Sequence, residues 1–252
     1  MARRYVIKQD SAPSAPISGI DYHATLNEEQ YAAVSSAPGA ALVIAGAGSG
    51  KTRTLTYRVA WLLDHGTDPW NILLLTFTNK AAREMTERVR ALIPIDLSRL
   101  WSGTFHSIAN RILRQHADYL GYTPAFTIMD SDDRKSMIKN IVKTLKLDEK
   151  SSRFPKPEVL SSLFSLADNE GAGIQETLEN AYPYLSNHLD AILDVHEQYV
   201  LRKQETNSMD FDDLLLNVVR LFQEQEHLRA LYGARFHHIL VDEYQDTNYL
   251  QS

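Results

Sequence analysis

The chain has 252 residues, of which 44% are hydrophobic and 23% charged, and its formal net charge is −6. These values are typical of a soluble globular protein with one or two domains, and the negative charge argues against a protein that coats nucleic acid through bulk positive charge. The sequence has no cysteine, which excludes disulfides, thiolate zinc sites and cysteine nucleophiles. No apolar run approaches the roughly 18 residues of a membrane span. We therefore expect a cytoplasmic protein with no membrane partner.

Strand and helix patterns alternate in the first half of the chain. Residues 1–24 lack the apolar core of a signal peptide and are expected to form a flexible leader. "TLNEEQYAAV" then has the pattern of a helix N-terminus, with Thr25 as N-cap and Glu28 three residues later. "ALVIAG" is a continuous apolar run that ends in glycine, which predicts a buried parallel strand. The helix predicted next, in "KTRTLTYRVAWLLDHG", ends at Gly66.

The alternation continues and then stops. "NILLLTF" and "RLWSGTF" are predicted strands, and "KAAREMTERVRALI" and "HSIANRILRQHADYL" are the helices that follow them. Between about 114 and 208 only helical patterns occur, including one predicted helix over 130–150. "FDDLLLNVVRLF" is again a helix and "FHHILVDEYQDTN" a strand that runs into acids. These patterns predict an α/β domain, residues 25–113 and 209–252, with a parallel sheet covered by helices on both faces. An all-α insertion, residues 114–208, interrupts it.

The segment "AGAGSGKT" has the spacing of a phosphate-binding loop. The pattern G-x-x-x-x-G-K-S/T requires glycine where this chain has Ala45, but that position ends the strand and is remote from the phosphates, so a small residue fits. Backbone N–H groups of the loop and the following helix N-terminus attract anions. Lys51 can reach the β- and γ-phosphates, and the Thr52 hydroxyl can bind Mg²⁺. The alternative is a chance glycine-rich turn. The predicted ATP-binding loop comprises Ala45, Gly46, Ala47, Gly48, Ser49, Gly50, Lys51 and Thr52.

A carboxylate pair follows the last predicted strand. Asp242 and Glu243 come directly after "HILV", and ligands of open α/β sheets bind at the carboxyl ends of the strands. Asp242 can hold Mg²⁺, and Glu243 can orient and deprotonate an attacking water. An Asp-Glu pair alone is more often a solvated strand end. Together with the phosphate loop it predicts a catalytic site, formed by Lys51, Asp242 and Glu243, that uses ATP and Mg²⁺.

The order of six motifs resembles a known family. "LNEEQ", "AGAGSGKT", "LLLTFTNKAAREM", "GTFHSIANRIL", "MDFDDLL" and "VDEYQDTN" are similar to the N-terminal half of superfamily 1 DNA helicases of the UvrD/Rep/PcrA type, from about 26 to 248. Alanine is common at the Ala45 position in that family. The resemblance implies a RecA-like P-loop NTPase fold with a helical insertion that contacts DNA.

The resemblance also implies roles for single residues. Gln30 corresponds to a glutamine that reads adenine, and Arg53 to an arginine near the nucleotide; from the sequence alone Gln30 is a helix-surface residue. Gln245 and Asp246 would couple the phosphate state to DNA, although a helix-capping turn explains them equally well. Phe77 could stack on DNA bases or be a core aromatic. The implied DNA contacts are Phe77, Thr78, Asn79, Thr104 and His106.

Two charged segments, one within the predicted insertion and one directly after it, have structural alternatives. In "MDFDDLL", Asp210 is predicted to cap the following helix, with Asp213 three residues on. Between Arg134 and Lys156 there are eight Lys or Arg and two acids, a local charge of +6. Such a run is either a solvated helix face or a surface that contacts DNA. The lysines that recur at helical spacing are Lys135, Lys139, Lys143, Lys146 and Lys150.

The resemblance implies an ATP-dependent helicase that moves 3′ to 5′ on single-stranded DNA and acts at junctions of single and double strands, with DNA-repair proteins as partners. The first alternative is the motor of a recombination helicase–nuclease of the AddA/RecB kind, and the second is a non-motor nucleotide-dependent binding protein. The family's second motor domain and its arginines are not in this sequence. We therefore expect a piece of a longer helicase, which alone binds Mg-nucleotide weakly and does not unwind DNA.

Overall fold

The computed structural model describes residues 18–46, 48–147 and 154–251. The predicted leader up to residue 17, the loop residue Ala47, and Lys150 lie outside these ranges. Contacts divide the chain into unit 1, residues 1–104 and 231–243, and unit 2, residues 105–230 and 244–252. The domain boundaries predicted from the sequence, after residues 113 and 208, fall elsewhere along the chain, and the assignment of motor and insertion domains stays a prediction.

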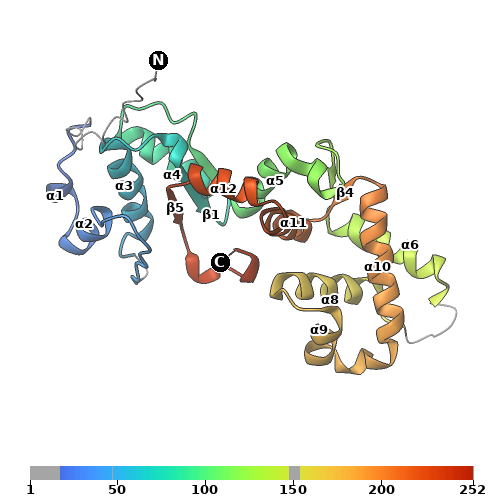
Figure 1. The fold of residues 1–252 in the computed structure, drawn as a ribbon. Coiled ribbons are helices and arrows are strands. Elements are labelled where there is room, and N and C mark those ends of the chain that lie inside the picture. The colour runs from blue at the N-terminus through green and yellow to red at the C-terminus, as the bar shows by residue number, and fades with distance from the viewer. Residues whose placement is uncertain (1–17, 47, 148–153, 252) are drawn as a thin grey trace, which may run out of the picture. The chain divides into compact units, whose positions relative to one another are not determined.

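Unit 1 is built on a three-stranded parallel sheet with the order β2-β1-β5 (Figure 1). The central strand β1 (Ile72–Thr76) pairs with β2 (Trp101–Thr104) and with β5 (His238–Val241), in registers that place Leu73 opposite both Trp101 and Ile239. Every residue of β1 is buried, as a strand covered on both faces requires. The three strands and their parallel pairing confirm the predicted α/β fold.

Helices α3 (Lys51–Asp64) and α4 (Asn79–Leu92) follow the phosphate loop and β1. They pack on each other, and α4 also packs on β1 and β2. Their apolar faces meet Ile72, Leu74 and Leu240 of the sheet in one core, to which α3 contributes Val59 and α4 Met85. Gly66, with a φ of 89°, lies two residues beyond α3 as predicted. The short helix η1 (Pro69–Asn71) leads into β1.

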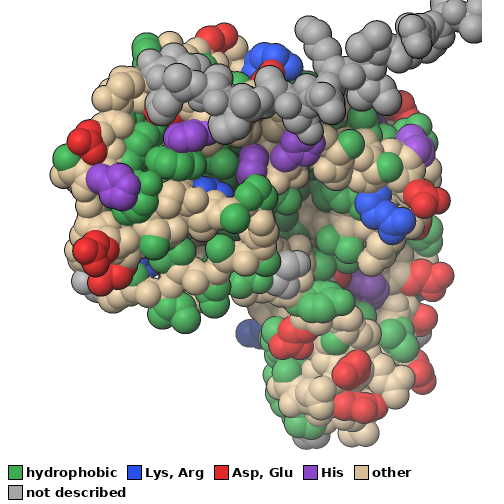
Figure 2. Space-filling view, turned by 60° about the vertical axis from the view of Figure 1, so that its left-hand side comes forward, with side chains coloured by type: hydrophobic (Ala, Val, Ile, Leu, Met, Phe, Trp, Pro, Cys, Tyr) green, Lys and Arg blue, Asp and Glu red, His purple; other side chains and the backbone are tan. Residues whose placement is uncertain are grey.

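Residues 41–46 do not form the predicted strand. They have no strand partner among the described residues, and Leu42, Val43 and Ile44 are exposed, Ile44 at 88%. A continuous apolar run indicates that a segment favours burial. A buried strand also needs a neighbouring strand that forms hydrogen bonds with its backbone N–H and C=O groups. In the described sheet β5 pairs only with β1. The side of the molecule that carries α1, α2 and α3 shows hydrophobic side chains exposed among polar ones (Figure 2).

The predicted first helix is divided in two. Helix α1 covers Tyr22–Thr25 and α2 covers Glu28–Val34, and Asn27, not Thr25, is the N-cap of α2. The Asn27 side chain accepts a hydrogen bond from the Gln30 N–H, and the Gln30 side chain accepts one from the Asn27 N–H. This reciprocal capping box satisfies two backbone donors at once, which Thr25 could not do at the end of α1.

Unit 2 is mainly helical. A core formed by α6, α8, α9 and α10 includes the fully buried Ile138, Leu160, Phe164, Leu178 and Ile192. Helix α11 packs against α5. The helices of this unit are α5 (Phe105–His116), η2 (Ala117–Leu120), α6 (Ser131–Thr144), α8 (Pro157–Glu170), α9 (Ile174–Ala181), η3 (Pro183–His188), α10 (Leu189–Glu205), α11 (Phe211–Glu224), η4 (Tyr244–Asp246) and η5 (Tyr249–Gln251), while α12 (Glu226–Arg235) belongs to both units.

The insertion differs from the prediction in two places. It is not all-α, because β3 (Thr127–Ile128) and β4 (Ser208–Met209) form a small parallel sheet. Two-residue strands have no period that a sequence pattern can display. The helix predicted over 130–150 ends at Thr144 as α6, and Lys146 adopts a φ of 54°. The left-handed region is incompatible with continuing a right-handed helix.

Buried charges join α10 to α11. Asp210 caps α11 as predicted, in a capping box with Asp213. The Lys203 ammonium lies 2.7 Å from Asp213 Oδ1 and 3.3 Å from Asp210 Oδ2, and the Tyr199 hydroxyl donates to Asp210 Oδ2 at 2.7 Å. Arg134 is also buried and pairs with Asp210 and Asp212. The acids of "MDFDDLL" are therefore part of the packing of unit 2.

Asp168, which lies near this network, makes the stability of unit 2 depend on pH. Burial is the main cause that raises its pKa from 3.8 to about 7, while the Lys203 charge lowers it and Asp210 and Asp213 raise it. In the folded protein the carboxyl group keeps its proton up to about pH 7, whereas the unfolded chain releases it above about pH 4. The folded state is therefore destabilised progressively as the pH rises from 4 to 7.

We expect Asp168→Asn to remove this dependence, because the amide does not ionise. Urea unfolding at pH 5 and pH 7.5 should show that the variant gains more stability relative to the wild type at the higher pH than at the lower one. Asp194→Asn, at an exposed site on α10, is the control and should behave like the wild type at both values. An equal effect of Asp168→Asn at both pH values would contradict the raised pKa.

Within the described residues, no helix combines the length and the apolar character required to cross a membrane.

Candidate nucleotide-binding site

The predicted phosphate loop leads into the N-terminus of α3. Gly48 and Gly50 have φ values of 76° and 86°, in the left-handed region that glycine adopts without strain. A Cβ atom at Gly50 would lie 2.9 Å from the Gln30 side-chain nitrogen, so a side chain at this position would displace the Gln30 amide. No side chain caps α3 at Gly50. The first N–H groups of α3 therefore point toward the loop, where an anion can bind.

Three donor groups of the loop are engaged by its own carbonyl groups. The Lys51 ammonium donates to the Ala45 carbonyl at 3.3 Å. Ser49 donates twice to the Gly46 carbonyl, from its N–H at 3.3 Å and from its hydroxyl at 2.7 Å. A bound phosphate would replace these carbonyl groups as the acceptor. Because a phosphate is charged, its hydrogen bonds to an ammonium are stronger than those of a neutral carbonyl.

Gln30 and Arg53 connect the loop to the first two helices. The Gln30 amide nitrogen donates to the Ser49 carbonyl at 3.0 Å. Arg53 donates to the Thr25 carbonyl at 3.0 Å, and its guanidinium lies 5.1 Å from the centre of the Tyr57 ring. Both side chains therefore contact this site, and Gln30 is more than a helix-surface residue. Its role in reading adenine stays a prediction.

The carboxylate pair lies at the same edge of the sheet as the end of β1. The Asp242 N–H donates to the Leu75 carbonyl at 2.9 Å, which continues the pairing of β5 with β1 by one residue. Burial raises the pKa of Asp242, and the neighbouring Glu243 adds to this, while the Lys51 charge lowers it. The Lys51 ammonium and the Asp242 carboxylate are thus close enough to interact, although 190 residues separate them in the sequence.

Glu243 has an unusual backbone. Its φ of 52° lies in the left-handed region, which costs a residue with a Cβ atom about 1–2 kcal/mol. Non-glycine residues in such conformations cluster at functional sites. The conformation ends β5 sharply, and the chain enters η4 directly afterwards.

The predicted Mg²⁺ ligands are Thr52, in the first turn of α3, and Asp242. Among the described residues, no group of three or more His, Asp or Glu side chains is placed to hold a metal ion. Mg²⁺ is usually held by one or two carboxylates together with phosphate oxygens and water. One hydroxyl, one carboxylate and a bound triphosphate fit that mode of binding.

The first predicted DNA segment follows β1. The Phe77 side chain is 39% exposed, so the core-aromatic alternative does not hold. Thr78 is the N-cap of α4 and accepts a hydrogen bond from the Ala81 N–H at 3.1 Å, and Asn79 is the first residue of α4. Thr78 therefore has a structural task that is sufficient to explain its presence. Phe77 and Asn79 stay candidates for DNA contact.

The second predicted DNA segment, "GTFHS", crosses from one unit to the other. Thr104 ends β2 in unit 1, and His106 lies in the first turn of α5 in unit 2. Burial lowers the pKa of His106, against the opposing charge of Asp212. The His106 ring lies 5.9 Å from the ring of Phe211.

Sequence reasoning missed Phe211, because it assigned "MDFDDLL" to structure alone. Phe211 is the first residue of α11, and its ring is 54% exposed. The signal was an aromatic residue between two helix-capping acids, where the capping box explains Asp210 and Asp213 but not a large apolar side chain between them. Its exposure makes Phe211 a further candidate for base stacking.

The predicted coupling residues are exposed. Gln245 and Asp246 lie in η4 at the surface of unit 2, immediately after the last residue of unit 1, Glu243. They lie in one turn of 3₁₀-helix, and both the coupling role and the helix-capping alternative stay predictions.

Comparison with known proteins agrees with the motif order. Residues 26–252 match the profile of the UvrD/REP helicase N-terminal domain. Over 227 residues the chain is 40% identical to the protein called ATP-dependent DNA helicase PcrA in Staphylococcus aureus strain COL and in Staphylococcus epidermidis strain RP62A. The match covers 90% of this chain and 30% of each relative. The loop geometry, the carboxylate pair at the end of β5 and this match over nine-tenths of the chain lead to one conclusion: the chain belongs to the UvrD/REP helicase N-terminal domain family.

Proposed function

We propose that this chain forms the ATP-binding part of the motor of a DNA helicase. The observation that carries the proposal is the convergence of the Lys51 loop and the Asp242–Glu243 pair at the edge of the sheet where β1 ends and Phe77 follows. The relatives are named ATP-dependent DNA helicases, which supports the same activity here. Movement 3′ to 5′ on single-stranded DNA, action at junctions, and a role in repair or replication in the cytoplasm are part of the proposal.

Each residue has a chemical task in this mechanism. Lys51 and the N-terminus of α3 bind the β- and γ-phosphates, and Asp242 and Thr52 hold Mg²⁺. Glu243 orients the attacking water and accepts its proton. Mg-ATP supplies the phosphoanhydride bond whose hydrolysis drives movement. Phe77, and Phe211 in unit 2, offer exposed rings on which bases of any sequence can stack.

The proposal is tested by Lys51→Ala. Because a hydrogen bond to a charged group contributes about 1.5–3 kcal/mol, the affinity of this chain for a fluorescent Mg-ATP analogue should fall about 10- to 100-fold. Fluorescence titration measures it. Lys156→Ala, at an exposed lysine in unit 2, is the control and should leave the affinity unchanged. If Lys51→Ala binds as well as the wild type, the loop is not the nucleotide site.

A second test concerns the basic strip, defined as Lys139, Lys143 and Lys146. All three are exposed, whereas Arg134 is buried and Lys135 pairs with Asp132 at 3.1 Å, so only part of the local charge of +6 reaches the surface from α6. Exposed ammonium groups at this spacing can follow a phosphate backbone.

Replacing the three lysines of the strip by alanine should weaken binding to a single-strand/duplex junction. The slope of log affinity against log salt should also decrease by about 2–3, because each phosphate contact contributes about 0.9 to it. Fluorescence anisotropy at several salt concentrations provides both values. The variant Arg88→Ala/Arg90→Ala, on the exposed side of α4, controls for loss of charge elsewhere. An unchanged slope in the triple variant would show that the strip is only a solvated face.

A further inference from the structure

The chain passes from unit 1 to unit 2 immediately after the carboxylate pair. Glu243 is the last residue of unit 1, and residues 244–252 belong to unit 2. Helix η5 within this segment packs against α8 and α11. The two residues that we assign to Mg²⁺ and to water activation are therefore followed by a segment that is fixed to the helical unit.

Tyr249 holds this segment against the end of α8. Gly171, which follows α8 with a φ of 65°, lies under the Tyr249 ring so closely that a Cβ atom there would be 2.6 Å from the ring carbon Cε1. The left-handed backbone favours glycine at this position, and the absence of a side chain there allows the close approach of the ring. The contact adds to the packing of η5 on α8.

A chain of side-chain hydrogen bonds, the Asn relay, runs from this segment into the unit. It comprises Asn248, Asn169, Asp212 and Arg134. Asn248 caps η5, with its side-chain oxygen accepting from the Gln251 N–H at 3.1 Å, and its amide nitrogen donates to Asn169 Oδ1. Asn169 in turn donates to Asp212 Oδ1 at 3.1 Å and to the Ser165 carbonyl at 2.8 Å.

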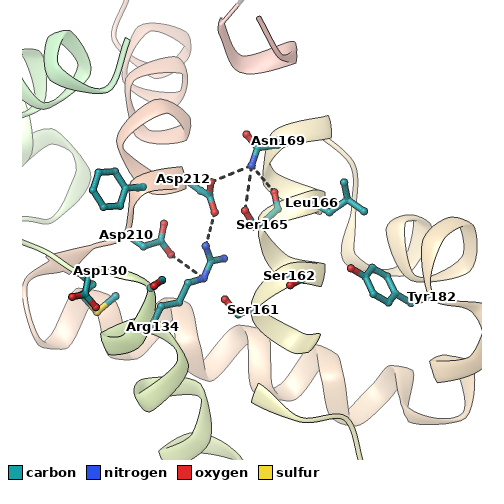
Figure 3. A pocket seen from close by; sticks show the side chains of 13 residues that line it. Asp130, Arg134, Ser161, Ser162, Ser165, Leu166, Asn169, Tyr182, Asp210 and Asp212 are labelled. Carbon is teal, nitrogen blue, oxygen red and sulfur yellow. Dashed lines mark hydrogen bonds and ion pairs between the residues drawn. The ribbon is translucent and has the colours of Figure 1, made fainter. Parts of the chain in front are cut away.

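Figure 3 shows the inner end of the relay. Asp212 lies between Asn169 of α8 and Arg134 of α6, and it accepts a hydrogen bond from each. These three residues line a cavity of about 570 Å³ together with Ser161 and Ser165. Arg134 is on α6, in the turn that precedes Lys139, and α6 also carries Lys143 of the basic strip. The relay thus connects the helix that carries two of the three lysines of the strip to the segment that follows Glu243.

The polar groups of the relay depend on one another. Asn169 uses its oxygen for Asn248 and its nitrogen for Asp212 and Ser165. Asp212 balances the charge of the buried Arg134. Loss of one partly buried partner leaves a polar group of the relay without its hydrogen bond, which is unfavourable. A displacement of Asn248 is therefore opposed by its hydrogen bond to Asn169 and, through Asn169, by Asp212. In the same way, a displacement of α6 moves Arg134 and Asp212 and changes the hydrogen bonds of Asn169 and Asn248.

We infer that the Asn relay couples DNA contact on the helical unit to the nucleotide site. In this inference, which rests on the proposed function, Asn169 and Asn248 are positioning residues. They act on Asp242 and Glu243 through the backbone of the segment that follows. The left-handed backbone of Glu243 lies at the junction, so a shift of residues 244–251 reaches the carboxylate pair within one residue.

The test measures coupling in the 252-residue chain and not stability alone. The affinity for a fluorescent Mg-ATP analogue is measured with and without a saturating oligo-dT strand, and the affinity for the strand with and without nucleotide. The wild type should show the same change, about fivefold or more, in both directions, because coupling is reciprocal. In Asn169→Ala and in Asn248→Ala the change should vanish, while each ligand alone binds within twofold of the wild type.

Hydrogen exchange provides a readout that needs no second ligand. Nucleotide alone should change amide exchange in residues 157–170 of α8 in the wild type but not in Asn248→Ala. Asn248 lies in the terminal segment, outside the buried core of unit 2, so this variant keeps the test valid if Asn169→Ala unfolds. Asn180→Ala, at an exposed asparagine on α9, is the matched control and should keep both the coupling and the exchange response.

The possible outcomes are distinct. Coupling that persists in both variants, or a wild type that binds both ligands without coupling, overturns the inference and leaves the proposed function intact. A wild type that binds neither nucleotide nor DNA contradicts the proposed function, and the inference falls with it. Coupling that disappears only in the two relay variants supports both.

Discussion

Glu243→Gln is expected to lower the rate of ATP hydrolysis by about 10²- to 10⁴-fold, the usual contribution of a general base. The measurement follows ATPase activity stimulated by single-stranded DNA. Glutamine keeps the size of the side chain and can still orient a water, but it cannot accept the proton. Because the variant also removes a negative charge beside the triphosphate, Mg-ATP should bind at least as tightly as in the wild type.

The separation of rate from affinity makes this result specific. A general loss of structure would reduce both quantities, whereas loss of the base reduces only the rate. Glu226→Gln, on the exposed side of α12, is the control and should change neither. If Glu243→Gln hydrolyses ATP within tenfold of the wild type, another residue activates the water and the assignment of Glu243 is wrong.

Lys203→Met is expected to destabilise unit 2 by about 3–5 kcal/mol, the usual effect of removing one partner of a buried ion pair. Lys203 is 4% exposed and bonds to both Asp210 and Asp213. Although burial alone would raise the pKa of Asp210, Lys203 and Arg134 hold it below its ordinary value. Methionine fills the space of the lysine stem but leaves Asp213 without its cation and Asp210 with Arg134 alone. Urea unfolding of the 252-residue chain at pH 7 measures the loss.

The neighbouring residue provides a matched control for this variant. Arg202→Met removes the same charge from the same helix at an exposed site, where it pairs with the exposed Glu205. Exposed pairs contribute about 0–1 kcal/mol, so the control should remain close to the wild type. A loss below about 1 kcal/mol in Lys203→Met would mean that the acids take up protons or water without cost, contrary to the buried network described above.

The sheet could be predicted where an apolar run and its neighbours coincide in the structure. The segment at 72–76 is apolar throughout, and strands at 101–104 and 238–241 pair with it on both sides. Residues 41–46 carry the same signal but have no described partner, so the same rule failed there. The sequence shows which segments favour burial. Which of these segments become buried strands depends on pairing with segments that are distant in the sequence. The split between α1 and α2 was missed for a local reason, because Asn27 was not considered as the cap.

The backbone of the candidate site could be predicted more fully than its side-chain contacts. Glycines at fixed spacing determine the loop, and a strand that ends in two acids determines the position of the carboxylates. The hydrogen bond from Gln30 to Ser49 and the bond from Asn248 to Asn169 join residues 19 and 79 positions apart. Nothing in a single sequence indicates such pairs, because amide side chains have no periodicity of their own.

The path of the chain between the two units limits how this chain can change in evolution. The chain crosses at Thr104, between residues 230 and 231, and at Glu243, so each unit is made of two separate pieces of sequence. Two of the three crossings lie within the motifs "GTFHS" and "DEYQD". A helical unit exchanged between relatives as one continuous cassette would leave behind residues 244–252, and with them Asn248 and Tyr249. The two units are therefore expected to be inherited together. Any new sequence of α8 has to remain compatible with the short segment that follows the carboxylates.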